Sequence, residues 1–381
     1  MLKPAKIDDI QTYIAGHWVF VTVTTSTGIT GIGESTYFTH PVAIKAIIED
    51  LKENYLGQDP YRPEFLYQRT LKKHCMIDAA ASSAMAAIDQ ALWDIKGKAL
   101  DVPIWQLLGG KVRDKVRAII LIQAPTANEL IQKAVEAKDE GFTALKIKPF
   151  MSDWSIASSA RTLQQVSDTV KDVRLALGWD VDLAVEVHRN LAPDQAIQFA
   201  DMVRDASLYF IEDPVQPFSA TVNKHVARGM HTPTALAERS INIWEFREFS
   251  DEPHISILRP DVGLAGGFTQ MKKIAAIAES RHQRILPHNF TSPLITACHV
   301  QLAACTHNWD VQGYVRETVS PWVDVVTAIN KVEDGFIQIP DTPGIGMSLN
   351  MDYVRSAPYE PFGNKFGHTA YLASDGGVKQ Q

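Results

Sequence analysis

Residues 182–214 read DLAVEVHRNLAPDQAIQFADMVRDASLYFIEDP, and this stretch decides the predicted fold. An apolar segment leads to Glu186, a helical pattern follows with Pro193 in its first turn, and a second apolar segment leads to Glu212. A strand, a helix and a strand in this order form a βαβ unit, whose two strands lie parallel. Each strand of the unit ends in a carboxylate.

The same unit recurs over most of the chain. Eight apolar segments alternate with helical patterns at intervals of roughly 25–30 residues, which predicts a closed parallel barrel of the TIM type. The alternative, an open doubly wound sheet, would carry a phosphate-binding glycine loop after its first strand, but Gly28, Gly31 and Gly33 lie between β segments and are typical of turns. The expected barrel strands are Val116–Ile122, Ala144–Pro149, Asp182–His188, Leu208–Pro214, Thr234–Ser240, His254–Val262, Arg284–Phe290 and Trp309–Glu317.

Two further regions flank the barrel, which we place at residues 116–325. Residues 1–115 begin with β-rich segments and continue with helical patterns, of which the strongest is Ala79–Leu100. Residues 326–381 are rich in Pro and Gly and contain a short β segment, Gly335–Pro340. We expect this tail to pack back on the first region.

Composition excludes several classes of protein. The net charge of −7 argues against a general nucleic-acid-binding protein. No apolar run reaches the roughly 20 residues that a membrane span needs, and the start, MLKPAK, lacks the apolar segment of a secretory signal. Three cysteines in 381 residues argue against a disulfide framework, so we expect a reduced, cytoplasmic setting.

Carboxylates end three consecutive barrel strands. Glu186, Glu212 and Glu238 are separated by 26 residues each, one βα unit, and the carboxyl ends of barrel strands meet at one mouth. Three ionised carboxylates need a cation when they share a semi-enclosed site. Hard oxygen ligands favour Mg²⁺, with Mn²⁺ tolerated, whereas zinc is disfavoured because no Cys/His cluster appears.

Acid–base groups flank this predicted metal site. Lys146 and Lys148 end the second strand on the same side, and a neighbouring ammonium and metal would both lower the pKa of Lys148. His288 ends the seventh strand, with Asp261 one unit earlier as its expected orienting partner. Such a site can remove a proton next to a substrate carboxylate and stabilise the resulting ene-diolate. Glu317 ends the eighth strand and, if protonated, can donate a hydrogen bond to a carboxylate oxygen.

These motifs together resemble the enolase superfamily, in its mandelate racemase branch, over essentially the whole chain. The resemblance implies a (β/α)7β barrel with an α+β capping domain built from the N-terminal block and the C-terminal tail. It is carried by Ala91-Leu92-Trp93-Asp94, Leu107-Leu108-Gly109-Gly110, Lys146-x-Lys148, Glu186, Glu212-Asp213-Pro214, Glu238-Arg239, Asp261 with Gly266-Gly267, Pro287-His288 and Glu317.

The resemblance also implies roles for these residues. Glu186, Glu212 and Glu238 match the metal ligands, and Lys148 and His288 match the acid–base groups on the two faces of the substrate. Lys146 and Asp261 match the residues that assist these two groups, and Glu317 matches the residue that assists enolisation. Two positions depart from the usual pattern: Glu186 stands where Asp is common, and Ala237 where Gly often precedes the third ligand. The segment 186–191 and the segment 232–239 also resemble mannonate dehydratase-like sequences, whose base arrangement differs, so the sub-branch stays open.

The expected function is Mg²⁺-dependent dehydration of an acid sugar to a 2-keto-3-deoxy acid, with no organic cofactor. A racemase, epimerase or cycloisomerase of a hydroxy acid, sugar acid or anhydro-sugar acid would use the same residues, and a non-catalytic barrel protein is the alternative from another class. Which of Lys148 and His288 is the base stays open, because stereochemistry decides it.

Oligomerisation into a homo-oligomer is implied by the resemblance. The expected substrate contacts are His188, Thr36, Tyr37 and His17.

Overall fold

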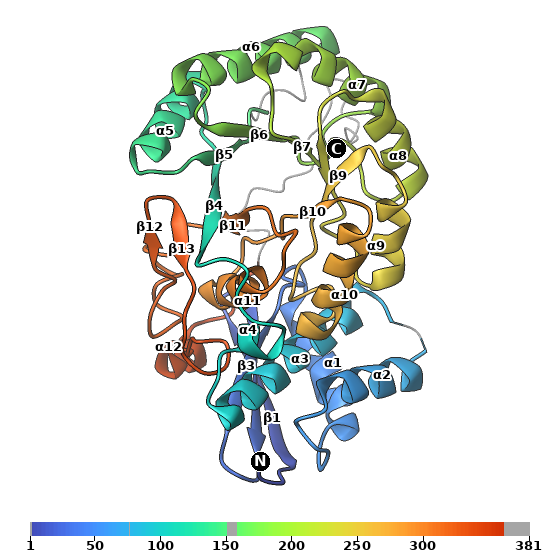
Figure 1. Ribbon diagram of the computed structural model, residues 1–381, viewed down its shortest axis with the longest axis vertical. Coiled ribbons are helices and arrows are strands. Elements are labelled where there is room, and N and C mark those ends of the chain that lie inside the picture. Colours follow the sequence, from blue (N-terminus) through green and yellow to red (C-terminus); the bar gives the residue numbers. More distant parts are fainter. Residues whose placement is uncertain (1, 76, 151–157, 362–381) are drawn as a thin grey trace.

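Eight parallel strands form a closed barrel in the computed structural model, which describes residues 2–75, 77–150 and 158–361. Neighbouring strands pair in parallel from β4 through β10, and β11 returns to pair with β4. A parallel bridge between Ile285 and Trp309 joins the last two strands, so the ring closes (Figure 1). The barrel strands are β4 (Lys115–Ile122), β5 (Ala144–Ile147), β6 (Asp182–Glu186), β7 (Ile211–Glu212), β8 (Thr234–Leu236), β9 (Ile255–Leu258), β10 (Arg284–Ile285) and β11 (Gln312–Tyr314).

Seven consecutive connections between the barrel strands contain helices, which gives the predicted (β/α)7β order. Local capping fixes where several of them begin: Thr126 accepts the amide of Glu129, and Asn242 accepts the amides of Trp244 and Glu245. The helices are α5 (Ala127–Asp139), α6 (Ser159–Leu177), α7 (Pro193–Met202), α8 (Ala220–Gly229), α9 (Ile243–Ser250), α10 (Gly267–Glu279) and α11 (Pro293–Ala304), and a short helix, η2 (Arg204–Ala206), follows α7.

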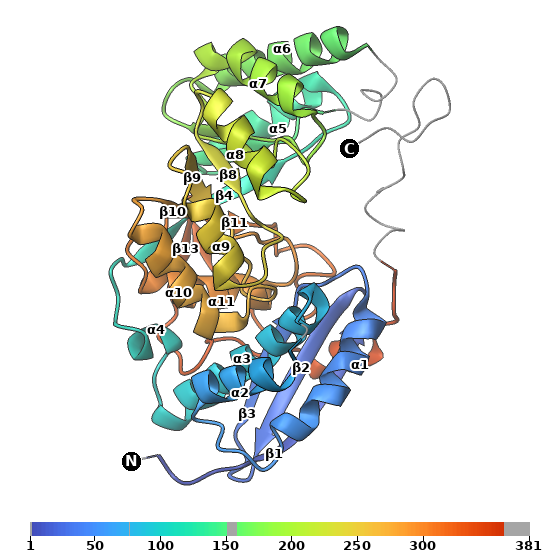
Figure 2. The same ribbon diagram turned by 90° about the vertical axis from the view of Figure 1, so that its right-hand side faces the viewer.

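A smaller α+β unit lies below the barrel (Figure 2). Its three-stranded antiparallel sheet consists of β1 (Ile7–Ala15), β2 (Trp18–Thr25) and β3 (Thr30–Ser35). Helix α3 (Ala79–Leu100) lies between this sheet and α10 of the barrel, which explains why its residues are buried on nearly all sides. The remaining helices are α1 (Pro41–Leu51), η1 (Lys52–Asn54), α2 (Pro63–Lys73) and α4 (Ile104–Leu107).

The tail packs on the first region, as expected, and also on the barrel. Strands β12 (Val332–Glu333) and β13 (Phe336–Gln338) form a hairpin that pairs with residues 115–117 of β4. These residues extend beyond the part of β4 that pairs with β5 and β11, so the hairpin covers an otherwise open strand edge.

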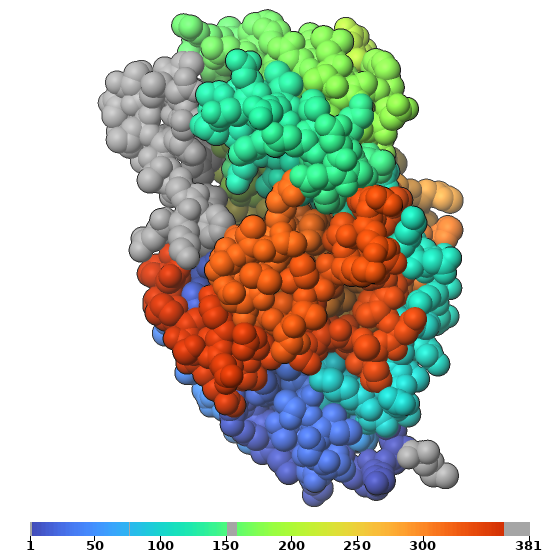
Figure 3. Space-filling view, turned by 90° about the vertical axis from the view of Figure 1, so that its left-hand side faces the viewer, coloured from blue at the N-terminus to red at the C-terminus, as the bar shows by residue number. Residues whose placement is uncertain are grey.

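Later tail residues return to the small unit. Ile345 donates its amide to Asp94 of α3, and α12 (Met351–Ser356) packs on β1. Figure 3 shows the C-terminal part of the chain on the surface between the N-terminal block and the upper half of the barrel. Residues 362–381 of the predicted tail lie outside the described residues. Among the helices that the structure describes, none is long and apolar enough to span a membrane.

Candidate active site

The three predicted metal ligands lie together at the carboxyl ends of neighbouring strands. Glu186 and Glu212 are register partners on β6 and β7, and Glu238 follows β8 two residues after its end. All three are largely buried, with exposed side-chain fractions of 7%, 0% and 11%. The sequence spacing therefore brings three carboxylates into one shielded place, as expected.

Cations of the chain itself bind these carboxylates. The Lys146 ammonium lies 3.0 Å from Glu186 Oε2 and 2.7 Å from Glu212 Oε1. Arg259 Nη2 lies 2.9 Å from Glu212 Oε1, and Arg189 Nη1 lies 2.7 Å from Glu238 Oε1. The cluster is thus already balanced by three positive side chains.

Neither arginine was among the site residues predicted from the sequence. Arg259 directly follows β9, and a charged residue directly after the apolar run Ile-Ser-Ile-Leu was a usable signal. Arg189 carried no such signal, because a left-handed turn positions it: His188 and Arg189 have φ of 56° and 66°.

The buried charges shift one another's protonation. Burial, the largest single effect, would raise the pKa of Glu186, but the Lys146 ammonium, a hydrogen bond with Glu212 and the Arg259 charge together hold that pKa well below its usual range. The pKa of Glu212 is raised well above its usual range, first by burial and then by the neighbouring Glu186 charge, which Arg259 offsets only in part. Burial also acts on Glu238, but His288 and Arg189 lower its pKa to about 2. Opposite pKa shifts of this kind are expected for two crowded carboxyl groups, of which one ionises more readily than the other.

The donor set suits a hard cation, although the present side-chain positions do not form a metal cage. Within the described residues, no three His, Cys, Asp or Glu side chains are arranged to hold a metal ion as they stand. Lys146 and Arg259 occupy the oxygens that a metal would take, yet Glu212 Oε2 is buried and has no hydrogen-bond partner among the described residues. A buried carboxylate oxygen without a donor is a vacant ligand position for Mg²⁺.

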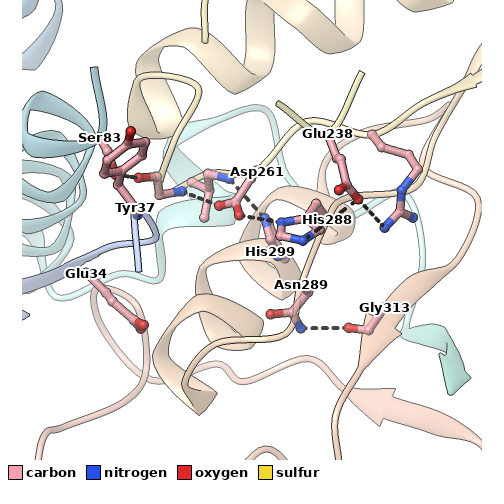
Figure 4. A network of polar contacts seen from close by, with 12 residues as sticks. Glu34, Tyr37, Ser83, Glu238, Asp261, His288, Asn289, His299 and Gly313 are labelled. Atoms are coloured by element: carbon pink, nitrogen blue, oxygen red, sulfur yellow. Dashed lines mark hydrogen bonds and ion pairs between the residues drawn. The ribbon is translucent and has the colours of Figure 1, made fainter. Parts of the chain in front are cut away.

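His288 and Asp261 form the predicted pair. His288 Nδ1 lies 2.8 Å from Asp261 Oδ2, and His288 Nε2 lies 3.9 Å from Glu238 Oε2, so the second ring nitrogen faces the carboxylate cluster (Figure 4). Asp261 is 2% exposed and His288 18%, so the carboxylate is shielded while the imidazole remains accessible. A carboxylate hydrogen-bonded to one ring nitrogen fixes the orientation of the imidazole.

Lys148 directly follows β5, beside β6 in the strand order, and so lies at the opposite end of the carboxylate row from His288. Burial lowers the pKa of its ammonium, and the positive charges of Arg189 and Lys146 act in the same direction, against an opposing effect of Glu186. The pKa of Lys148 is therefore lowered, as predicted, and burial is the main cause.

His188 lies beside the cluster but carries no positive charge near neutral pH. Burial and the adjacent Arg189 lower its pKa to about 3. Arg189 Nη2 lies 2.8 Å from His188 Nε2, and since a guanidinium only donates, Nε2 accepts and the proton is on Nδ1. His188 is thus a neutral donor at the mouth.

The remaining predicted residues are placed differently. Glu317 accepts the backbone amide of Asn330 at 3.0 Å as well as its side-chain amide, and burial raises the Glu317 pKa to about 7. His17 is buried, with its ring centroid 5.1 Å from that of Trp18. Thr36 is buried against Gly263, whereas Tyr37 is half-buried at the start of the loop after β3. The structure brings none of these into contact with the carboxylate cluster through an observed bond among the described residues, and their roles stay predictions.

Strained backbone marks the ends of the same strands. Besides His188 and Arg189, Asp213 and Ala237 have φ of 40° and 80°, in the left-handed region that favours glycine. Four residues with left-handed backbone thus lie beside the three carboxylates. This indicates that the fold holds the side chains of the site in place at a cost in backbone strain.

Two family models match the chain. Residues 1–109 match the mandelate racemase / muconate lactonizing enzyme N-terminal domain, and residues 129–353 match the family described as enolase C-terminal domain-like. A D-galactonate dehydratase of Variovorax paradoxus is 30% identical over 366 residues, 93% of this chain and 95% of that protein. A D-mannonate dehydratase of Caulobacter vibrioides is 29% identical over 388 residues, 94% of this chain and 96% of that protein.

Solved structures show the same architecture. An enolase of Agrobacterium radiobacter, assigned provisionally as a galactarate dehydratase and crystallised with sodium and L-malate, has a TM-score of 0.92 at 25% identity and covers 99% of this chain and 100% of its own. The fold, the arrangement of strand-end residues and these matches lead to one conclusion: the chain belongs to the mandelate racemase / muconate lactonizing enzyme family of the enolase superfamily.

Proposed function

We propose that the chain is a carbon–oxygen lyase that dehydrates an acid sugar to a 2-keto-3-deoxy sugar acid. The observation that carries the proposal is the position of Lys148 and the His288–Asp261 pair at the two ends of one row of three carboxylates. Relatives of similar length that are D-galactonate and D-mannonate dehydratases support the choice of aldonic acids as the first substrates to test.

Glu186, Glu212 and Glu238 would hold Mg²⁺, or Mn²⁺ in its place. The vacant Glu212 Oε2 supports this assignment, and the long, flexible stem of Lys146 allows its ammonium to withdraw from the oxygens that it now binds. When bound, the metal would stabilise negative charge that develops on the substrate carboxylate. The longer side chain of Glu186, compared with the usual Asp, keeps its Oε1 on the amide of His188 at 2.9 Å.

The chain's own residues would move the protons. Lys148, whose pKa is lowered by burial, takes the α-proton of the substrate as a neutral amine. The electron pair of the broken C–H bond forms the enol double bond, and the bond from the β-carbon to its hydroxyl breaks. His288 donates the proton from Nε2 that lets this hydroxyl leave as water, while Asp261 holds Nδ1. The enol then becomes the ketone. A substrate of opposite configuration at the α-carbon would exchange the two roles.

Proton NMR in D₂O tests the reaction. The enzyme and Mg²⁺ are incubated with D-galactonate, D-mannonate and galactarate, then with further aldonic, aldaric, uronic and anhydro-sugar acids. Loss of substrate with a new deuterated 2-keto-3-deoxy signal is expected for at least one acid. Deuterium exchange at the α-carbon without loss of water would replace the proposal by a racemase or epimerase, and conversion of an anhydro-sugar acid alone would replace it by a cycloisomerase. No reaction and no exchange would contradict it.

Two substitutions test the residues. Lys148→Ala and His288→Asn are each expected to lower kcat at least about 100-fold, because each removes a general acid or base. The matched control is Lys133→Ala on the exposed face of α5, which should keep the normal rate. Circular dichroism verifies that all three variants are folded. Normal turnover in both site variants would remove the proposed mechanism.

A further inference from the structure

We propose that Ser83, on α3 of the capping unit, is a positioning residue that fixes the His288–Asp261 pair across the interface between the two units. The inference rests on the proposed roles of His288 and Asp261 and adds a residue from outside the barrel. Figure 4 shows Ser83, Asp261 and His288 in one row of contacts, with Tyr37 beside Ser83.

A short chain of hydrogen bonds connects the serine to the imidazole. The Ser83 hydroxyl donates to the carbonyl of Gly263 at 2.5 Å, and the amide of Gly263 donates to Asp261 Oδ1 at 2.8 Å. The other oxygen of Asp261 accepts from His288 Nδ1 at 2.8 Å. Both backbone polar groups of Gly263 are therefore used, one toward α3 and one toward the Asp261 carboxylate.

The Ser83 hydroxyl has no spare hydrogen-bonding capacity. A hydroxyl has one donor and two acceptor positions, and its donor is on Gly263. Ser35 Oγ, 2.7 Å away, must then donate to Ser83, and the amide of Tyr37 donates to it at 3.2 Å. Ser83 and Ser35 are 0% and 2% exposed, so water does not compete for these bonds. The orientation of the hydroxyl is consequently fixed.

The same contact holds the loop that begins at the end of β3. Thr36 donates its amide to the Gly263 carbonyl at 3.2 Å, beside the hydrogen bond from Ser83. A Cβ on Gly263 would lie 2.5 Å from Thr36 Cγ2 and 3.0 Å from the carbonyl oxygen of Glu34, so only glycine allows this approach. The start of the predicted substrate loop and the turn that carries Asp261 are thus bound to each other and to Ser83.

A second serine on α3, Ser82, provides a control, because it also joins the two units but does not contact the Asp261 turn through Gly263. Ser82 donates to the carbonyls of Leu264 and Ile241 at 2.8 and 3.0 Å, and it is as buried as Ser83. It joins the same helix to the same loop but makes no bond to Gly263 or Asp261 among the described contacts. Ser82→Ala is therefore the matched control for Ser83→Ala.

The first measurement is NMR of the substrate-free protein labelled with ¹⁵N-histidine. The Nδ1–H signal of His288 is identified by its loss in His288→Asn. Ser83→Ala is expected to shift or broaden this signal, whereas Ser82→Ala leaves it unchanged. Ser35→Ala removes the hydroxyl that donates to Ser83 and accepts the Tyr37 amide at 3.4 Å, while leaving the Ser83–Gly263 hydrogen bond in place. It is expected to give a smaller change, which provides a milder variant if Ser83→Ala does not fold. An unchanged signal in Ser35→Ala and Ser83→Ala, or an equal change in Ser82→Ala, would overturn the proposal.

The second measurement uses an acid sugar that the wild type dehydrates. Ser83→Ala is expected to lower kcat at least tenfold, and Ser82→Ala less than twofold. Equal losses of kcat in the two variants would show that Ser83 is only a structural contact between the units. The two measurements separate this inference from the proposed function: if no acid sugar is dehydrated, the NMR result alone still decides whether Ser83 positions the pair.

Discussion

Arg259 shows at the scale of a single residue how this site differs from a simple triad of acids. Its guanidinium is 3% exposed and lies between Glu212 and Glu238, at 2.9 and 3.9 Å. Buried ion pairs add little stability when they form, but breaking one leaves an unpaired buried charge. Arg259 therefore stabilises the carboxylate cluster whenever no metal does so.

We expect Arg259→Met to lower the free energy of unfolding by about 3–5 kcal/mol in the absence of divalent metal. Added Mg²⁺ or Mn²⁺ should then raise the melting temperature of this variant more than that of the wild type, since the metal supplies the missing positive charge. Thermal unfolding with EDTA and with metal measures both effects. Arg204→Met, at an exposed pair with Asp201, is the control and should change little. An equal metal response in wild type and Arg259→Met would contradict this account.

Ala237 allows a second prediction at this scale. Its φ of 80° favours glycine, but its buried methyl group packs in the barrel, so Ala237→Gly exchanges relief of strain for lost packing. Ala235, two residues earlier, is equally buried in β8 with ordinary strand backbone. We expect Ala237→Gly to destabilise the chain by at least about 1 kcal/mol less than Ala235→Gly. Urea denaturation of both variants measures the two losses of unfolding free energy. Equal losses would show that the backbone of Ala237 is unstrained.

At the scale of an element, α10 begins without a cap of its own. Gly266 at its N-cap offers no side chain, and Asp89 of α3 instead accepts the amide and the hydroxyl of Thr269. A Cβ on Gly267 would lie 2.3 Å from Asp89 Oδ2, and the φ of Gly267 is 72°. The helix after the Asp261 turn is thus capped by a residue of the other unit.

Gly267→Ala should therefore destabilise the chain by more than the roughly 1–2 kcal/mol that a left-handed backbone alone costs. Gly28→Ala is the control, since Gly28 also has a left-handed φ, 82°, but has no atom within 4 Å of a Cβ. The difference between the two losses in urea denaturation measures the contact with Asp89. A smaller loss for Gly267→Ala than for Gly28→Ala would exclude that contact.

The elements also show what the sequence could and could not predict. The order of the barrel strands and the acids near their ends could be predicted, because apolar runs that alternate with helical patterns are visible in the residue types themselves. The pairing of the hairpin β12–β13 with β4 was not predicted, because the open edge of residues 115–117 arises only when β4, β5 and β11 have paired. Arg189 was missed for a similar reason, since its position depends on a left-handed turn that its residue types do not favour.

At the scale of the whole molecule, Glu34 joins the two units through a buried carboxyl group. It is 0% exposed, contacts the hydroxyl and amide of Ser292 in the segment after His288, and has its pKa raised to about 8, mainly by burial and partly by the charge of Asp261. The unfolded carboxyl ionises near pH 4.5, while the folded one stays protonated to about pH 8. Between these values the unfolded state loses the proton first, so this group's contribution to stability falls as the pH rises.

Glu34→Gln removes this titration while keeping the size of the side chain. We expect the variant to gain stability relative to the wild type between pH 5.5 and pH 8, as measured by urea midpoints. Other carboxyls with raised pKa, such as Asp89 and Glu317, remain in both proteins and cancel in the comparison. Parallel pH curves for the two proteins would show that Glu34 is ionised in the folded state.

The turn at Gly16 has a consequence for synthesis of the chain. Its amide donates to the carbonyl of Pro358 at 3.0 Å, and its carbonyl accepts the amide of Glu360 at 2.9 Å. Residue 359, which bridges to Gly16, leaves the ribosome 343 positions later (359 minus 16), roughly 17–70 seconds at ordinary elongation rates. Ile345, whose amide donates to Asp94, is synthesised 251 positions after it. The N-terminal unit is therefore synthesised first but completed among the last. During most of translation, its sheet β1–β3 lacks the contacts that the tail later supplies.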